Sequence, residues 1–145
     1  MVDISHKDST IRVAKASGKV ILGGNIIAQL SNGEIHTKKG AVFSTAIIAA
    51  TMAVKKTSDL IPFCHPLMIN GCKVNINVEG DCAYINCEVK ISGKTGVEME
   101  ALTGVTAAAL TIYDMCKALS HEIKITDIEL IKKTGGKSDY EKVSK

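Results

Sequence analysis

Hydrophobic and polar residues alternate most regularly in the middle of the chain. Apolar side chains occupy every second position from Val74 to Val78 and again from Ile85 to Ile91, and Glu79-Gly80-Asp81 separates the two runs. A period of two residues directs one set of side chains toward a core and the other toward solvent. The pattern therefore predicts a β-hairpin with one solvated face.

Two longer segments have helical character. Residues 42–55 carry apolar or small side chains on every side, which predicts a helix that is buried all round and ends near Lys55-Lys56, where cations suit a helix C-terminus. Residues 95–119 form an Ala-rich stretch that predicts a second helix, with Glu98 and Glu100 in its first turn. Neither segment contains proline, which would interrupt a helix.

The remaining segments complete a simple order of elements. Residues 11–22 predict a strand weakened by Gly18, residues 25–30 a short turn of helix, and residues 123–131 a closing strand. The resulting order is strand, helix, strand, strand, helix, strand. This order predicts an α+β fold, a ferredoxin-like sandwich with an antiparallel sheet.

The composition is that of one globular domain. The 145 residues are 46% apolar and 23% charged, a balance that excludes a disordered or fibrous chain. We expect a single domain over residues 1–145, with a basic, flexible segment at 132–138 and a flexible tail at 138–145. The longest apolar runs fall far short of the roughly 18 residues that a membrane span needs, so no membrane association is expected.

Charge and aromatic content argue against nucleic acid as a partner. The net charge is only +3, and the chain holds three Tyr, two Phe and no Trp, which leaves no stacking platform for single strands. The five cysteines follow no pairing pattern, and the first ten residues contain no apolar leader. These features favour a reduced, cytoplasmic protein.

Two familiar site motifs are incomplete. Gly135-Gly136-Lys137-Ser138 resembles the end of a P-loop, but Ile131 stands where the first glycine is required and no helix can follow. The glycine amides and nearby lysines could still surround an anion, or the segment could be a solvated basic tail. Because no Cys-x-x-Cys occurs and the four His are scattered, we expect no metal site.

The most informative group of ionisable residues lies on the second predicted helix. Asp114 and Lys117 share one face, and their apolar neighbours indicate a covered surface, where a partly buried acid–base couple has tunable protonation states. An ordinary surface ion pair is the alternative. Glu100 lies about 21 Å away along the same helix, so either the ligand is long or a second subunit completes the site, and we expect an oligomer. His65 stands in a rigid loop between two prolines and is a further candidate.

Four segments, taken in order, resemble one family. They are Asp59–Leu67 (DLIPFCHPL), Lys94–Thr103 (KTGVEMEALT), Leu110–Ala118 (LTIYDMCKA) and Lys133–Ser138 (KTGGKS). They resemble the cyclic pyranopterin monophosphate synthases, the MoaC proteins of molybdenum-cofactor biosynthesis, and the resemblance runs from about residue 2 to residue 138. Phe63 and Thr134 stand where Leu and Ser are usual, and neither change removes a titratable group.

The resemblance implies a lyase that converts 3′,8-cyclo-7,8-dihydroguanosine triphosphate to cyclic pyranopterin monophosphate and pyrophosphate. It implies a ferredoxin-like fold in a homohexamer, a trimer of dimers with active sites between subunits, and no redox cofactor; a role for Mg²⁺ with the triphosphate stays open. The catalytic residues that it implies are Asp114, Lys117 and Lys39. The substrate-binding residues that it implies are Phe63, Cys64, His65, Met99, Glu100, Lys55, Lys133, Lys137 and Arg12.

A non-catalytic nucleotide-binding regulatory module is the alternative, because ferredoxin-like folds support many such functions. It would share the basic residues and the oligomer, but it would not need Asp114 beside Lys117. An RNA-binding module on the same fold needs aromatic residues on the sheet, and the predicted hairpin offers only Tyr84.

Overall fold

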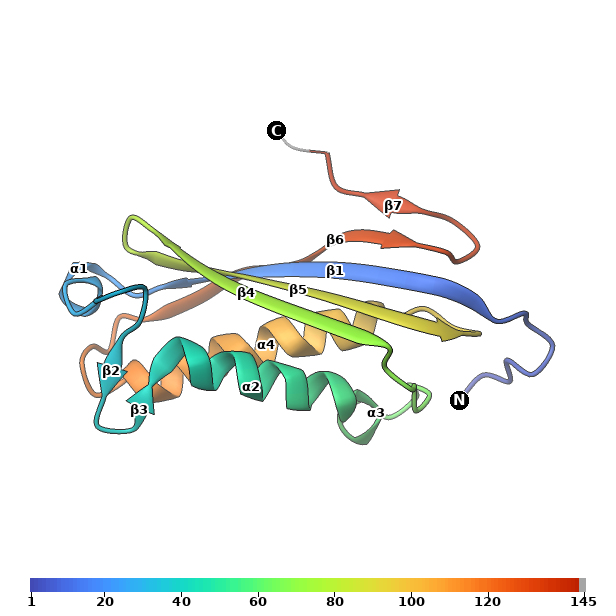
Figure 1. Ribbon diagram of the computed structural model, residues 1–145, viewed down its shortest axis with the longest axis horizontal. Coiled ribbons are helices and arrows are strands. Elements are labelled where there is room, and N and C mark those ends of the chain that lie inside the picture. Colours follow the sequence, from blue (N-terminus) through green and yellow to red (C-terminus); the bar gives the residue numbers. More distant parts are fainter. Residues whose placement is uncertain (144–145) are drawn as a thin grey trace.

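The computed structural model describes residues 1–143 and contains a five-stranded antiparallel sheet that two long helices cover on one face (Figure 1). The strand order is β4-β5-β1-β6-β7, and a small hairpin, β2-β3, stands apart from this sheet. The elements are β1 (Thr10–Ile21), α1 (Gly24–Ile27), β2 (His36–Thr37), β3 (Gly40–Ala41), α2 (Val42–Lys55), α3 (Thr57–Leu60), β4 (Gly71–Glu79), β5 (Cys82–Gly93), α4 (Glu98–Cys116), β6 (Lys124–Thr134) and β7 (Tyr140–Glu141). The expected α+β class with an antiparallel sheet is confirmed.

The predicted hairpin is β4 and β5, and its alternation fixes which face meets the helices. Val74 pairs with Cys87 and Ile76 with Ile85. Cys87 and Ile85 are fully buried, whereas Asn75, which lies between Val74 and Ile76 in β4, is exposed. β1 lies in the centre of the sheet and pairs with both β5 and β6. The sheet therefore has one apolar face beneath α2 and α4 and one polar face.

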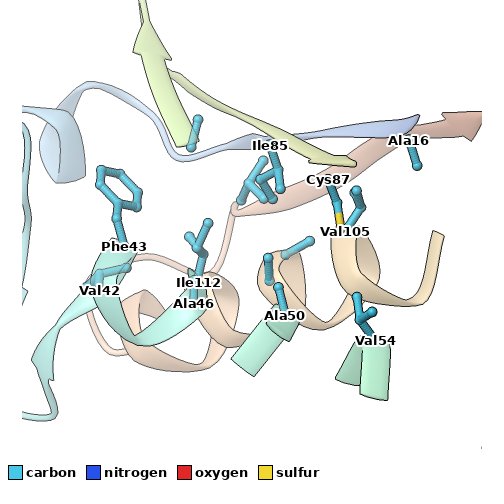
Figure 2. Close-up of a cluster of buried hydrophobic side chains, with 14 of the residues drawn as sticks. Ala16, Val42, Phe43, Ala46, Ala50, Val54, Ile85, Cys87, Val105 and Ile112 are labelled. Carbon is cyan, nitrogen blue, oxygen red and sulfur yellow. The ribbon is translucent and has the colours of Figure 1, made fainter. Parts of the chain in front are cut away.

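The core is built from small and β-branched side chains at the helix–sheet interface. Ala46 and Ala50 of α2 and Val105 of α4 point toward Ile85 and Cys87 of β5 (Figure 2). Small residues bring the helices close to the sheet and to each other, so a dense core is reached with little aromatic volume. The closely packed helix–sheet interface is therefore filled without many aromatic side chains, which agrees with the low aromatic content of the sequence.

Gly104 is the point of closest approach between α4 and its neighbours. A Cβ at this position would lie 2.8 Å from Cys87 Sγ and 2.8 Å from Val54 Cγ2, nearer than carbon atoms tolerate. The missing side chain is therefore a packing requirement that offsets the low helix propensity of glycine.

We expect Gly104→Ala to destabilise the fold by up to about 2 kcal/mol, because an overpacking cost of about 1–3 kcal/mol is offset by a helix-propensity gain of about 1 kcal/mol, and two atoms at 2.8 Å favour the upper part of that cost. Urea denaturation followed by circular dichroism measures the difference. Gly24→Ala is the matched control, since a Cβ at Gly24 meets nothing within 4 Å. An unchanged midpoint for Gly104→Ala would show that α2 and α4 separate without penalty.

The bounds of α2 agree with the predicted helix, but its burial does not. Ile48 and Met52, one turn apart, are 65% and 45% exposed in the single chain, so the expectation of a helix buried all round is wrong. Only the face that carries Ala46 and Ala50 meets the core. The outer face of α2 is apolar and uncovered in this chain.

The expected flexible segment at 132–138 is wrong for residues 132–134. Lys133 is part of β6 and pairs with Ala14 of β1 on one side and Tyr140 of β7 on the other. The expected flexible tail at 138–145 includes strand β7, while residues 144 and 145 lie outside the described part of the chain. Lys142 continues the pairing by donating its backbone N–H to the Ile131 carbonyl at 2.7 Å.

Between residues 1 and 143, no helix is both long enough and apolar enough to cross a membrane.

Candidate active site

Three of the predicted site residues meet at the C-terminal end of α4. Lys117 Nζ lies 3.0 Å from Asp114 Oδ1, and Lys39 Nζ lies 2.8 Å from Asp114 Oδ2. Asp114 and Lys117 are three residues apart at the end of one helix, whereas Lys39 comes from the turn between β2 and β3, which lies beside this end of α4 (Figure 1). Each carboxylate oxygen of Asp114 thus has its own ammonium partner.

Glu34 holds the β2-β3 turn in place. Its carboxylate accepts the backbone N–H groups of Ile35 and Phe43 at 2.8 Å and of Ser44 at 3.0 Å, which fastens the hairpin to the first turn of α2. Burial acts to raise the pKa of Glu34, but these donors together hold it below its ordinary value. The sequence does not indicate this residue, because an isolated glutamate in a loop carries no local signal.

The electrostatics of the cluster keep Asp114 ionised. The hydrogen bond from Lys39, and next the one from Lys117, lowers the pKa of Asp114 below its ordinary value. The Asp114 side chain is 52% exposed and that of Lys117 58%, so the expected partly buried pair is wrong for the single chain. An ionised carboxylate that contacts two ammonium groups can accept a proton at one atom while a neighbour donates one at another.

We expect Lys39→Met to raise the pKa of Asp114, because its largest stabilising contact is lost. The ionised carboxylate is then favoured less, and protonation begins at a higher pH as the solution is acidified. NMR titration of the Asp114 side-chain carboxyl carbon measures the shift. Lys38→Met is the control, since Lys38 makes no ion pair with Asp114 in this structure; an equal shift in both variants would contradict the assigned pairing.

A cavity of about 580 Å³ opens beside this cluster. Asp114, Lys117 and Lys39 line it together with Gln29, His36, Thr37, Lys38, Met115, Ala118 and Leu119. Met115, Ala118 and Leu119 supply an apolar part of the wall, and the other lining residues are polar or charged. A small polar ligand can therefore enter and reach the carboxylate, and His36 joins the candidates, although no spacing in the sequence indicated it.

A second cavity, of about 540 Å³, lies at the other end of the sheet and is lined by several basic side chains. We call it the cation-lined cavity. The cavity is lined by Arg12 at the start of β1, Lys133 at the end of β6 and Lys137 in the loop that follows, so three predicted residues are brought together. Lys133 Nζ pairs with Glu98 Oε1 at 3.2 Å. His6, Lys7, Asp8, Thr10, Val13, Gly96, Val97, Thr134, Gly135, Gly136 and Ser138 complete the walls.

Gly135 is essential to the shape of this second cavity. Its φ is +87°, a left-handed conformation that side chains disfavour, and a Cβ there would strike the carbonyl oxygen of Ile11. The bend that it permits carries the chain from β6 across the start of β1. Lys137 is thereby placed on the same cavity as Arg12.

The Pro62–Pro66 loop places the other predicted residues near the N-terminal end of α4. Phe63 and His65 line a hollow with Met1, Val2 and Thr95. Burial raises the pKa of Cys64, and the charge of Glu100 adds to it.

Glu100 itself is only 3% exposed, and burial raises its pKa. Met99 beside it is exposed. Lys55 ends α2 and lines none of these three cavities.

The predicted residues therefore form groups at the two ends of α4. Glu98, on the cation-lined cavity, and Asp114 are separated by sixteen residues, about 24 Å of helix. One small reacting centre cannot contact both groups in a single chain. Within residues 1–143, no cluster of three or more His, Cys, Asp or Glu side chains is arranged to hold a metal ion.

Comparison with known proteins gives this arrangement a family. The family model described as MoaC family matches residues 1–136. The chain belongs to the MoaC family. It is 51% identical over 140 residues to the cyclic pyranopterin monophosphate synthase of Xanthomonas campestris pv. campestris (strain B100). The aligned residues cover 96% of this chain and 85% of that protein.

Two further members of the family extend the comparison. The cyclic pyranopterin monophosphate synthase of Clostridium acetobutylicum is 48% identical over 146 residues, which cover 99% of this chain and 89% of that protein. The molybdenum cofactor biosynthesis protein 1 of Dictyostelium discoideum is 49% identical over 162 residues. The match covers all of this chain but only 26% of the Dictyostelium protein, so the MoaC domain also occurs as one part of a much longer chain.

Proposed function

We propose that this MoaC-family protein is a cyclic pyranopterin monophosphate synthase of the cytoplasm. It would convert 3′,8-cyclo-7,8-dihydroguanosine triphosphate into cyclic pyranopterin monophosphate and pyrophosphate. Relatives about half identical over most of the chain carry the synthase name. The structural observation that carries the proposal is the Asp114 carboxylate held between Lys39 and Lys117 at the mouth of a cavity.

The reaction needs the chemistry that this cluster offers. Rearrangement of the purine-derived ring moves protons on and off ring nitrogen and carbon atoms, and an ionised Asp114 accepts protons while Lys39 or Lys117 donates them. In the cyclisation, a sugar hydroxyl loses its proton and attacks the α-phosphorus. The bond from that phosphorus to the bridging oxygen breaks, and pyrophosphate leaves with the bonding electrons.

The cation-lined cavity suits the triphosphate. Arg12, Lys133 and Lys137 supply charges that stabilise a leaving pyrophosphate, and the proposal assigns these three residues to the phosphates. Lys55 is assigned to the phosphates as well, from a partner subunit. The ring system is assigned to the remaining predicted residues, which are Phe63, Cys64, His65, Met99 and Glu100.

Subunit assembly would reconcile the two distant groups. We infer a ferredoxin-like chain that forms a homohexamer, a trimer of dimers, in which the Asp114 cluster of one subunit meets the cation-lined cavity of another. The strand order β4-β5-β1-β6 supports the ferredoxin-like assignment. The apolar outer face of α2, with Ile48 and Met52, supports a protein partner, because such surfaces are usually covered.

Complementation tests the shared site. An Asp114→Asn subunit and a Lys133→Met/Lys137→Met subunit should each be inactive alone. When they are co-expressed with different tags, random pairing should restore about a quarter of the wild-type activity, because one site in each mixed dimer keeps both intact groups. Mixed complexes without activity would show that both groups act within one chain.

A turnover assay tests the function itself. The purified protein is given the cyclo-dihydro-GTP intermediate, and cyclic pyranopterin monophosphate and pyrophosphate are measured together. Formation of both in equal amounts is the expected result, and tight binding without either product would make the protein a nucleotide-binding module. The proposal includes no cofactor, so turnover should persist with EDTA; a loss that Mg²⁺ restores would place that cation with the triphosphate.

A further inference from the structure

The segment before β1 crosses the loop that carries His65. His65 Nε2 lies 2.8 Å from the carbonyl oxygen of Val2, although the two residues are far apart in the sequence. A carbonyl oxygen only accepts hydrogen bonds, so Nε2 must carry the proton in this contact. The contact therefore determines which nitrogen of the neutral ring is protonated.

This segment is fastened by its own contacts. Lys94 Nζ donates to the Ser5 carbonyl at 3.2 Å, and the Ser5 backbone N–H donates to Asp3 Oδ1 at 2.8 Å. The Lys7 N–H closes a turn onto the Ile4 carbonyl at 3.1 Å. Val2 is thus held over His65 by contacts that do not involve His65.

The same segment borders two of the cavities that contain predicted site residues. Met1, Val2 and Ile4 line the hollow shared with Phe63 and His65, and four residues that follow line the cation-lined cavity, namely His6, Lys7, Asp8 and Thr10. A ligand that spans the two would lie along the segment. Within residues 1–143, His65 is the one predicted site residue that forms a hydrogen bond with residues 1–9.

We propose that the Val2 carbonyl is a positioning group that fixes neutral His65 as the Nε2–H tautomer, so that Nδ1 is the nitrogen offered to the substrate. An unprotonated Nδ1 accepts hydrogen bonds and donates none. It would bind an N–H group of the purine-derived ring and would disfavour a phosphate oxygen. This assignment rests on the proposed function, because that function places the substrate against His65.

The tautomer can be read directly by NMR. The full-length protein is labelled with ¹⁵N-histidine, and spectra are recorded at a pH where the rings are neutral; His65→Gln identifies the His65 signals among the four histidines. We expect Nε2 protonated and Nδ1 unprotonated. Lys94→Met, which releases Ser5 without touching His65, should shift the ring toward a mixture of tautomers. Lys90→Met, at an exposed lysine of β5, the strand that ends just before Lys94, should change nothing.

Steady-state kinetics test whether the Nε2–H tautomer of His65 contributes to turnover. Lys94→Met should lower kcat/KM roughly 2- to 10-fold, the effect of one ordinary hydrogen bond, and Lys90→Met should not. An Asn side chain places its amide near the position of Nδ1, whereas a Gln side chain places its amide near Nε2. His65→Asn should therefore retain more kcat/KM than His65→Gln.

Several results would overturn the proposal. A wild-type ring protonated at Nδ1 would do so, as would a Lys94→Met ring with unchanged tautomers. Equal activity of Lys94→Met and wild type, or higher activity of His65→Gln than of His65→Asn, would show that Nδ1 is not the nitrogen in use. If the wild-type protein makes no product, the synthase assignment is refuted. The NMR measurement of the His65 tautomer does not depend on turnover and still tests the role of the Val2 carbonyl.

Discussion

Replacing Asp114 by Asn should lower kcat roughly 100- to 10,000-fold, the usual contribution of a positioned acid–base group, while substrate affinity stays close to that of the wild type. An amide keeps the shape of the carboxylate, and its oxygen can still accept a hydrogen bond from Lys39 or Lys117. Its NH2 group cannot pair with the other ammonium, and the amide cannot accept a proton. Rapid-quench turnover and isothermal titration of the substrate separate the two quantities.

Asp127→Asn is the matched control for this variant. Asp127 lies on β6, has φ +57°, and Asn tolerates that conformation as well as Asp does. It is far in sequence from the cluster and lines neither the cavity at Asp114 nor the cation-lined one. Full turnover by Asp114→Asn would remove Asp114 from the chemistry, and a parallel loss of affinity would make it a binding residue.

Neutralising Lys133 and Lys137 together should lower kcat/KM roughly 100- to 10,000-fold, because each charge-assisted hydrogen bond to a phosphate contributes about 1.5–3 kcal/mol. Lys133→Met also leaves Glu98 without its partner on the cavity wall, and that carboxylate then repels the triphosphate. The salt dependence of substrate binding should weaken in the same variant. Steady-state kinetics at several ionic strengths measure both effects.

The control for this second variant removes the same amount of charge from β6 outside the cavity. Lys124 and Lys132 are exposed residues of β6 that do not line the cation-lined cavity, so Lys124→Met/Lys132→Met removes two charges without touching that site. Equal losses in the two double variants would show that net charge alone attracts the substrate. A loss confined to Lys133 and Lys137 supports a specific phosphate site.

The elements that could be predicted from the sequence are those whose periodicity is strong. The apolar positions of residues 42–55 gave the observed bounds of α2, and the alternation from Val74 to Ile91 gave β4 and β5. Exposure of Ile48 could not be predicted, because a sequence pattern marks a side chain as apolar without saying what covers it. The sequence does not distinguish residues 132–134 from flexible chain, because lysines outside a core pattern are typical of solvated segments. Pairing with β1 and β7 keeps these residues extended.

The candidate site divides in the same way. Helical spacing alone placed Asp114 beside Lys117, since residues three apart share a face. Lys39 is predicted as a site residue only by the family resemblance, because no local sequence pattern connects it with Asp114, 75 positions away. The Val2–His65 and Glu34–Phe43 contacts were invisible for the same reason, and each involves a backbone group that any residue would supply.

Two contacts fix the helical phase of α4. Gly104 must face Cys87 and Val54, and Asp114 must face Lys39. One residue inserted between positions 104 and 114 would turn Asp114 and Lys117 together by about 100°, while Lys39 stayed behind. Seven inserted residues would nearly restore the angle but displace the carboxylate by about 10 Å along the axis. No insertion satisfies both contacts, so natural variation in chain length should occur outside these ten residues.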